Sequence, residues 1–177
     1  MTDRMKTLTL ALAACTLLAL LPADAHAQEA RTDTEVIRSW QEPVKLDGRT
    51  ETRRVEVAFD YAQRVTLRRT YDDTGALLRT EVVDGQPQPS EAEIADATAI
   101  ITSDDELSTL IEQTGATVEG GFIYSAEGFE RPLAACGPGA RCLQFDLIAP
   151  SKLESVRFVV VDLATRQIVE RDLFPNL

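Results

Sequence analysis

Histidine and methionine are almost absent from this 177-residue chain. The one histidine is His26, and the two methionines are Met1 and Met5. Serine-histidine triads and most zinc and copper sites need histidine, and soft-metal sites often use methionine. If a leader ending at Ala27 is removed, neither residue type remains. We therefore expect no transition-metal site, no cofactor and no histidine-dependent catalysis.

Residues 1–27 have the order of a secretory signal peptide. Arg4 and Lys6 precede a mostly apolar run, which ends in small residues up to Ala27. This order predicts cleavage near Ala27, a periplasmic or secreted protein, and no membrane insertion after cleavage. Lipoprotein processing at Cys15 is the less favoured alternative, because the chain stays apolar for six residues beyond that cysteine.

Basic residues are too few to balance the acidic ones. The chain has 18 Lys and Arg against 29 Asp and Glu, a formal net charge of −11. Such a chain repels phosphate groups, so we expect no nucleic-acid partner. The densest carboxylates, at residues 72–73 and 104–106, stand at an expected turn and an expected helix start, where acidic residues are structurally favoured.

Periodicity begins only in the second quarter of the chain. Residues 28–52 show little of it and predict a linker pinned by Trp40, the alternative being a partner-binding peptide that exposes Trp40. Residues 53–86 alternate apolar and polar side chains in three runs, which predicts a three-strand antiparallel meander with a hairpin turn at residues 72–75. We treat residues 53–177 as a single α+β domain.

Residues 89–177 form the helix-plus-sheet unit of this prediction. Ser90 and Glu93 have the spacing of a capping box, and Ser103 with Glu106 repeats it, so two short helices are expected, the second ending near Gly115. Alternating runs then predict antiparallel strands, listed here by their apolar members: Val118, Phe122 and Tyr124; Leu143, Phe145 and Leu147; Val156, Phe158 and Val160; Ile168, Val169 and Leu173. The helices should lie on one face of this sheet.

Cys136 and Cys142 flank a Gly-Pro-Gly segment in the expected exported chain. A structural disulfide is the favoured interpretation, worth about 2 kcal/mol for so small a loop. A redox-active pair would want two intervening residues and a lowered thiol pKa, and a zinc site would want further ligands.

The segment from Ser90 to Ile94, with its Ser-x-x-Glu-Ile order, and the ending from Phe158 to Glu170 resemble the small non-catalytic N-terminal domains of copper amine oxidases. They are similar, more loosely, to PepSY domains. The resemblance covers about residues 89–173 and implies a cystatin-like fold, with a helix on an antiparallel sheet. The oxidase catalytic domain, its copper-binding histidines and its cofactor motif are missing here, so no oxidase residue is carried over.

The resemblance implies an exported, non-enzymatic binding or accessory module of the cell envelope with a protein partner. Because PepSY-like domains are associated with peptidase inhibition, the most specific form of this hypothesis is an inhibitor of an envelope peptidase. A histidine-free enzyme using carboxylates is an alternative that a cleft with two converging acidic side chains would favour. A structural subunit of an envelope assembly is another, favoured by a flat apolar patch or a strand edge. The sequence carries no signal for an oligomeric state.

The candidate partner contact is a loop between two expected strands. It comprises Phe129 with the flanking Glu127, Glu130 and Arg131, backed by Arg141 in the disulfide loop. A loop held by a disulfide loses less entropy on binding. The alternative is that Phe129 closes the end of the core.

Overall fold

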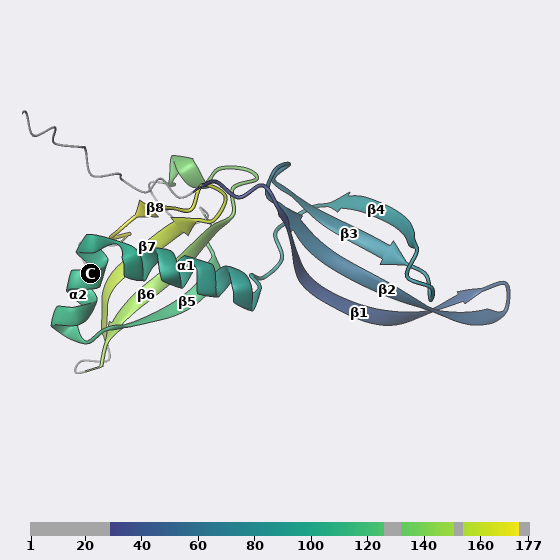
Figure 1. Ribbon diagram of the computed structural model, residues 1–177, viewed down its shortest axis with the longest axis horizontal. Helices are drawn as coiled ribbons and strands as arrows, with labels where there is room; N and C mark the ends of the chain where they lie inside the picture. The colour runs from purple at the N-terminus through teal and green to yellow at the C-terminus, as the bar shows by residue number, and fades with distance from the viewer. Residues whose placement is uncertain (1–28, 126–131, 151–153, 174–177) are drawn as a thin grey trace, which may run out of the picture.

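The structure is a computed structural model, which describes residues 29–125, 132–150 and 154–173. Within these residues the chain is α+β, with two α-helices and two four-stranded antiparallel sheets. The strand orders are β1-β2-β3-β4 and β5-β6-β7-β8. Figure 1 shows the first sheet beside a second lobe, in which the helices lie across the second sheet.

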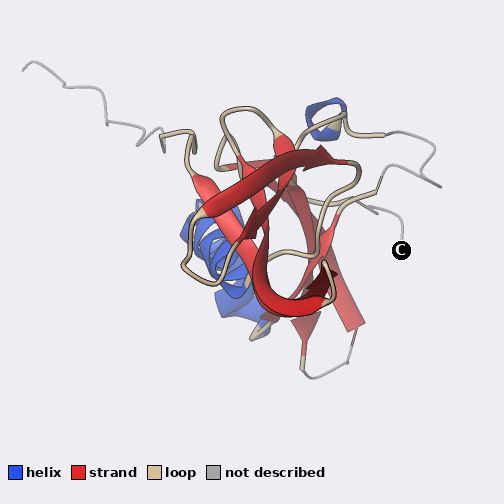
Figure 2. Ribbon diagram, turned by 90° about the vertical axis from the view of Figure 1, so that its right-hand side faces the viewer, coloured by secondary structure: helices blue, strands red, loops and turns tan. Residues whose placement is uncertain are grey.

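The first sheet is built by a chain that turns back on itself at each strand end. Its strands are β1 (Thr34–Leu46), β2 (Arg49–Asp60), β3 (Val65–Tyr71) and β4 (Leu77–Val83). Figure 2 shows how strongly the sheet curves. The turn before β4 is held by Asp72, whose Oδ1 accepts from the N–H groups of Thr74 and Ala76, while Gly75 takes a φ of +87°.

The expected linker at residues 28–52 is wrong for most of its length, because β1 and the start of β2 lie there. Two features of β1 obscure the alternation of apolar and polar residues that is typical of a strand. A bulge between Val36 and Arg38 breaks the two-residue period, and Pro43, a residue that is unusual in strands, lies within β1 opposite Thr52. Both are tolerated because β1 is an edge strand, where one row of backbone groups needs no partner. Trp40 lies within β1, half-buried, with the Arg38 guanidinium 4.8 Å from its ring centroid.

Helix α1 (Glu91–Ser103) begins at the expected capping box. The Ser90 hydroxyl accepts from the Glu93 N–H at 3.1 Å, and the Glu93 carboxylate accepts from the Ser90 N–H at 2.9 Å. Helix α2 (Asp105–Thr114) ends as expected at Gly115, which is left-handed with a φ of 67°.

The predicted second capping box is wrong, because Ser103 is the last residue of α1. Its hydroxyl donates to the Ile100 carbonyl at 2.9 Å. Asp104 caps α2 instead, accepting from the Leu107 N–H at 3.1 Å. Aspartate and serine are equally good N-caps, so the sequence offered two adjacent candidates.

The second sheet comprises β5 (Thr117–Ile123), β6 (Cys142–Ala149), β7 (Glu154–Asp162) and β8 (Gln167–Glu170), with a 3-10 turn η1 (Ala134–Cys136) between β5 and β6. The core lies between its inner face and the helices. Its buried members include Ala97, Ile100, Ile101 and Leu107 from the helices, and Leu143, Phe145, Leu147, Val159 and Val161 from the sheet.

The first sheet joins this core through the end of β2. Phe59 and Tyr61 are both buried in it, with their rings edge-to-face at a centroid distance of 5.0 Å. The segment before β1 also reaches across, since the Arg31 N–H donates to the Ala164 carbonyl at 2.9 Å. Among the residues described, we find no helix with the length and apolar character needed to cross a membrane.

Candidate functional site: a buried ion pair and an exposed strand edge

A fully buried ion pair lies where the two sheets meet. Arg141, just before β6, donates through Nε and Nη2 to the two carboxylate oxygens of Glu93, at 2.9 and 2.7 Å. Neither side chain is exposed to solvent. The remaining guanidinium nitrogen, Nη1, donates to the Pro87 carbonyl at 2.8 Å, and the guanidinium carbon lies 5.0 Å from the Phe59 ring centroid.

Glu93 has a third side-chain donor. The Tyr61 hydroxyl donates to Glu93 Oε1 at 2.5 Å, and Arg31 lies over the Tyr61 ring, 4.1 Å from its centroid. Burial by itself raises the pKa of Glu93, but the bonds from Arg141, Tyr61 and the Ser90 N–H hold it below its usual value. Burial, together with the adjacent Glu93 carboxylate, raises the pKa of Tyr61.

This buried cluster has the properties of a structural joint. Each oxygen of Glu93 accepts two hydrogen bonds, so the carboxylate is fully occupied by the protein itself. A general acid or base needs contact with its substrate, which a side chain with no exposed surface lacks. The cluster ties the connector before α1, the end of β2 and the start of β6 to one helix terminus.

A hollow of about 480 Å³ near the start of the described chain contains two carboxylates, Glu29 and Asp33, beside Arg31 and Arg166. Asp33 pairs with Arg31 at 2.7 Å, and this bond holds the pKa of Asp33 below its usual value. A proton donor at neutral pH needs the opposite shift. Within the described ranges, His, Cys, Asp and Glu form no group of three or more placed to hold a metal ion.

Strand β5, at the exposed edge of the second sheet, contains a β-bulge that turns one side chain outward. Gly120 pairs with Phe145, but Phe122 pairs with Gln144, so β5 holds one extra residue at Gly121. Regular pairing would place Phe122 opposite Leu143, on the helix-facing side. The bulge places Phe122 on the outer face instead, 65% exposed, and brings Ile123 opposite Leu143.

The bulge depends on two successive glycines. Gly120 and Gly121 have φ angles of +117° and +89°, which other residues rarely adopt. A Cβ on Gly121 would also lie 2.8 Å from Cγ1 of Ile94 in α1, so α1 packs directly on the bulge. From the sequence, Val118, Phe122 and Tyr124 were expected to belong to one strand, and Gly120 and Gly121 were expected only to loosen it. Two glycines inside an alternating run are the signal for a bulge, which would have found this site.

Two carboxylates stand beside Phe122 on the outer face. Glu119 of β5 lies directly opposite Asp146 of β6. Oδ1 of Asp146 is buried and has no hydrogen-bond partner among the residues described, and burial raises the pKa of this side chain. Like charges directly opposite each other destabilise a strand pair. The outer face therefore combines an exposed aromatic ring with two facing carboxylates.

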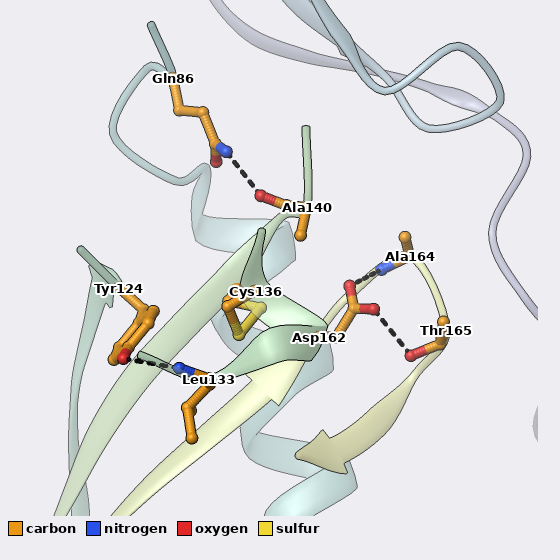
Figure 3. The surroundings of a disulfide bond; sticks show 9 residues. Gln86, Tyr124, Leu133, Cys136, Ala140, Asp162, Ala164 and Thr165 are labelled. Carbon is orange, nitrogen blue, oxygen red and sulfur yellow. Dashed lines mark hydrogen bonds between the residues drawn. A yellow bond between two sulfur atoms is a disulfide. The ribbon is translucent and has the colours of Figure 1, made fainter. Parts of the chain in front are cut away.

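The disulfide covers the neighbouring part of this outer face. Cys136 and Cys142 are bonded, with their Cα atoms 5.8 Å apart, as expected from the sequence. Figure 3 shows the bond between β6 and η1, with Tyr124 and Leu133 beside it. The Tyr124 hydroxyl accepts from the Leu133 N–H at 3.3 Å. Tyr124, just after the end of β5, is thus covered by the disulfide segment, whereas Phe122, two residues earlier, is exposed.

The predicted contact set is only partly described. Phe129, Glu127, Glu130 and Arg131 lie outside the described residues. The prediction for Arg141 is wrong: this side chain is fully buried against Glu93 and cannot contact a partner. The prediction included Arg141 because it lies in the disulfide-held loop between two expected strands, but the partner that buries it is 48 residues away.

No protein-family model matches the chain, and a search of curated proteins found no match to it.

Proposed function

We propose that this protein is an exported module that binds another protein through the outer face around Phe122 and has no turnover of its own. The observation that carries the proposal is the two-glycine bulge, which presents an aromatic side chain that regular pairing would bury. Aromatic side chains bury large areas at protein interfaces and are enriched among the residues that dominate binding energy. Bulges that redirect a side chain recur next to functional sites.

The position of Phe122 favours recognition of an extended segment. Among the described residues, β5 pairs only with β6, so its other edge is available for strand addition. In such an arrangement the backbone supplies affinity and alternate side chains supply specificity. Phe122 is the anchor, and the partner segment contributes an apolar side chain that packs on its ring.

The charge of the site favours a basic side chain in the partner. Glu119 and Asp146 are directly opposed, with one carboxylate oxygen lacking a donor among the described residues, and the whole chain carries a net charge of −11. A lysine or arginine placed between the two carboxylates would relieve their repulsion. The proposed ligand is therefore an extended, basic and partly apolar segment of an envelope protein.

The envelope location rests on two features. The leader-like residues 1–27 predict export, and the Cys136–Cys142 bond is consistent with an oxidising compartment. The cystatin-like interpretation of residues 89–177 is supported by α1 crossing an antiparallel sheet, as Figure 1 displays. The peptidase-inhibitor form rests on the resemblance to PepSY domains alone, so we propose the general binding function.

Affinity capture from a cell-envelope fraction tests the proposal. The parent protein and the variant Phe122→Ser are compared, with Val36→Ser as a matched control. Val36 is also an exposed strand side chain, at 45%, but it lies on β1 of the other sheet. We expect that the parent and Val36→Ser capture the same protein, and that Phe122→Ser binds it at least about tenfold more weakly, which corresponds to a contact worth about 1.4 kcal/mol.

The captured protein is then purified and titrated against the parent, the same two variants and Asp146→Asn. We expect Asp146→Asn to weaken binding and to reduce its dependence on salt, because it removes one of the two carboxylates. Equal capture by the parent and Phe122→Ser would remove this face from the binding site. Failure of the parent to capture any protein would overturn the function itself.

A further inference from the structure

Strand β4 has a sequence that is nearly symmetric about its central residue. It reads Leu-Leu-Arg-Thr-Glu-Val-Val from Leu77 to Val83. Two apolar residues stand at each end, Thr80 is at the centre, and opposite charges flank it at Arg79 and Glu81. Within the chain, Arg79 and Glu81 form an ion pair with each other at 2.8 Å.

The apolar ends of β4 are unusually exposed. Six large hydrophobic side chains are exposed in the described part of the chain, and three of them, Leu77, Leu78 and Val82, lie on this strand at 55, 49 and 67%. Strand β4 is an edge strand, pairing with β3 on one side only among the described residues. Exposed apolar edges invite pairing with another strand, and proteins that stay monomeric usually block them.

We propose that two copies of this chain pair through β4, antiparallel about a two-fold axis at Thr80, to form a continuous eight-stranded sheet. In this register Arg79 lies opposite Glu81 of the second copy, Thr80 lies opposite its own counterpart, and Glu81 lies opposite the second Arg79. Beyond these pairs, Leu78 meets Val82 and Leu77 meets Val83. A two-fold contact requires such a self-complementary surface.

Each of these pairs is favourable. Opposite charges and threonine pairs directly across a strand boundary stabilise antiparallel pairing, as do apolar pairs. Leu78 is the extra residue of a bulge between β3 and β4, because Thr70 pairs with Arg79 and Tyr71 with Leu77. The three central pairs therefore lie in the regular part of the strand, and the leucines add apolar contact at its ends.

The acidic character of the chain does not oppose this contact locally. The charges of Arg79 and Glu81 cancel, and on β3 Arg68 lies opposite Glu81 and Arg69 opposite Thr80. The other edge strands suit self-pairing less well. Strand β1 contains Pro43 and a bulge, β5 contains the two-glycine bulge, and β8 has four residues. The surface is also remote in sequence and fold from Phe122, so the two proposals stand or fall separately.

Sedimentation velocity over a concentration series tests the dimer with two variants at the axis, Thr80→Glu and Thr80→Lys. Each places like charges directly opposite each other in the dimer, so each should raise the dissociation constant at least about tenfold. Within the chain Thr80 lies opposite Arg69, so Thr80→Glu gains an attractive neighbour and should fold as the parent does. An equimolar mixture of the two variants should recover the dimer, because glutamate then meets lysine.

Gln41→Glu is the matched control, since Gln41 lies on the opposite edge strand across from an arginine, Arg54. It makes the same change in charge and should leave the dimer unchanged. A parent protein that remains monomeric up to about 1 mM would overturn the proposal. So would a dimer that Thr80→Glu leaves intact, or a variant mixture that stays monomeric while the parent dimerises.

Discussion

Arg141 and Glu93 meet in a bidentate ion pair with no solvent exposure, although 48 residues separate them in the sequence. Glu93 is at the same time the third residue of α1 and closes its capping box. One carboxylate therefore fixes the start of the helix, the start of β6 and, through Tyr61, the end of β2. The relative placement of the two sheets therefore rests on a charged carboxylate that is not exposed to solvent.

Removing one partner of this pair should be strongly destabilising. Arg141→Met leaves the Glu93 charge buried without its counterion, and we expect a loss of about 3–5 kcal/mol in the free energy of unfolding. The double variant Arg141→Met/Glu93→Leu should lose less than the sum of the two single variants, because no buried charge remains. Urea unfolding of the two single variants and the double variant measures these losses.

The control for this experiment is Arg171→Met. Arg171 also pairs with a carboxylate, that of Asp104 at 2.7 Å, but its side chain is 45% exposed. Its removal should change the free energy of unfolding by about 1 kcal/mol or less. Equal losses at Arg141 and Arg171 would contradict the assignment of the buried pair as the joint between the sheets.

The same pair predicts a dependence on pH. The folded-state pKa of Glu93 lies below its ordinary value of 4.5, so its contribution to stability is complete above that value and is lost as pH falls through the folded pKa. Compared with Glu93→Gln, the parent should therefore have its full stability advantage at pH 7. This advantage should shrink as the pH is lowered below about 4.5.

Urea unfolding at a series of pH values measures this difference. Asp33 and Asp104 also have pKa values lowered by arginine partners, but both proteins contain them, so their effect cancels in the comparison. A stability advantage that stays constant, or grows, as the pH falls would show that Glu93 is not held in its charged form.

Local signals in the sequence predicted local structure well. The Ser90 capping box predicted the start of α1, and Gly115 predicted the end of α2, because each depends on residues within one helical turn. The spacing of Cys136 and Cys142 predicted their bond for the same reason. Strand β1 was missed because its bulge and Pro43 remove the alternation by which strands are recognised.

The residues that define the candidate site depend on long-range partners and were not predictable in this way. Alternation placed Phe122 in one strand with Val118 and Tyr124, and only the pairing with β6 reveals the extra residue that turns Phe122 to the outer face. Arg141 is buried because Glu93 and the Pro87 carbonyl accept its hydrogen bonds, and nothing near Arg141 in the sequence indicates either partner. Burial of a charge is decided by the whole fold.

Processing of the chain can be checked by intact-mass measurement of the exported protein. We expect the mass of residues 28–177 less two hydrogens, because residues 1–27 are predicted to be a cleaved leader and Cys136 is bonded to Cys142. Denaturation followed by alkylation without a reductant should add nothing. A mass that still includes residues 1–27, or two alkylated thiols, would contradict the predicted export.

The last prediction concerns the bulge that presents Phe122. Gly121→Ala introduces a Cβ that lies 2.8 Å from Ile94 Cγ1, at a φ of +89°. We expect a loss of about 2–4 kcal/mol, since strain at positive φ and crowding against α1 add. Gly48→Ala is the control: its φ is +80°, but a Cβ there meets nothing within 4 Å, so only the strain of about 1–2 kcal/mol should appear.

Thermal and urea unfolding measure the stability of the two alanine variants. The affinity-capture experiment measures whether each variant still binds the partner. If the bulge is the device that turns Phe122 outward, Gly121→Ala should weaken partner binding along with stability, whereas Gly48→Ala should leave binding unchanged. Equal destabilisation by both variants would mean that α1 does not hold the bulge. Full binding by a destabilised Gly121→Ala would show that Phe122 is presented without it.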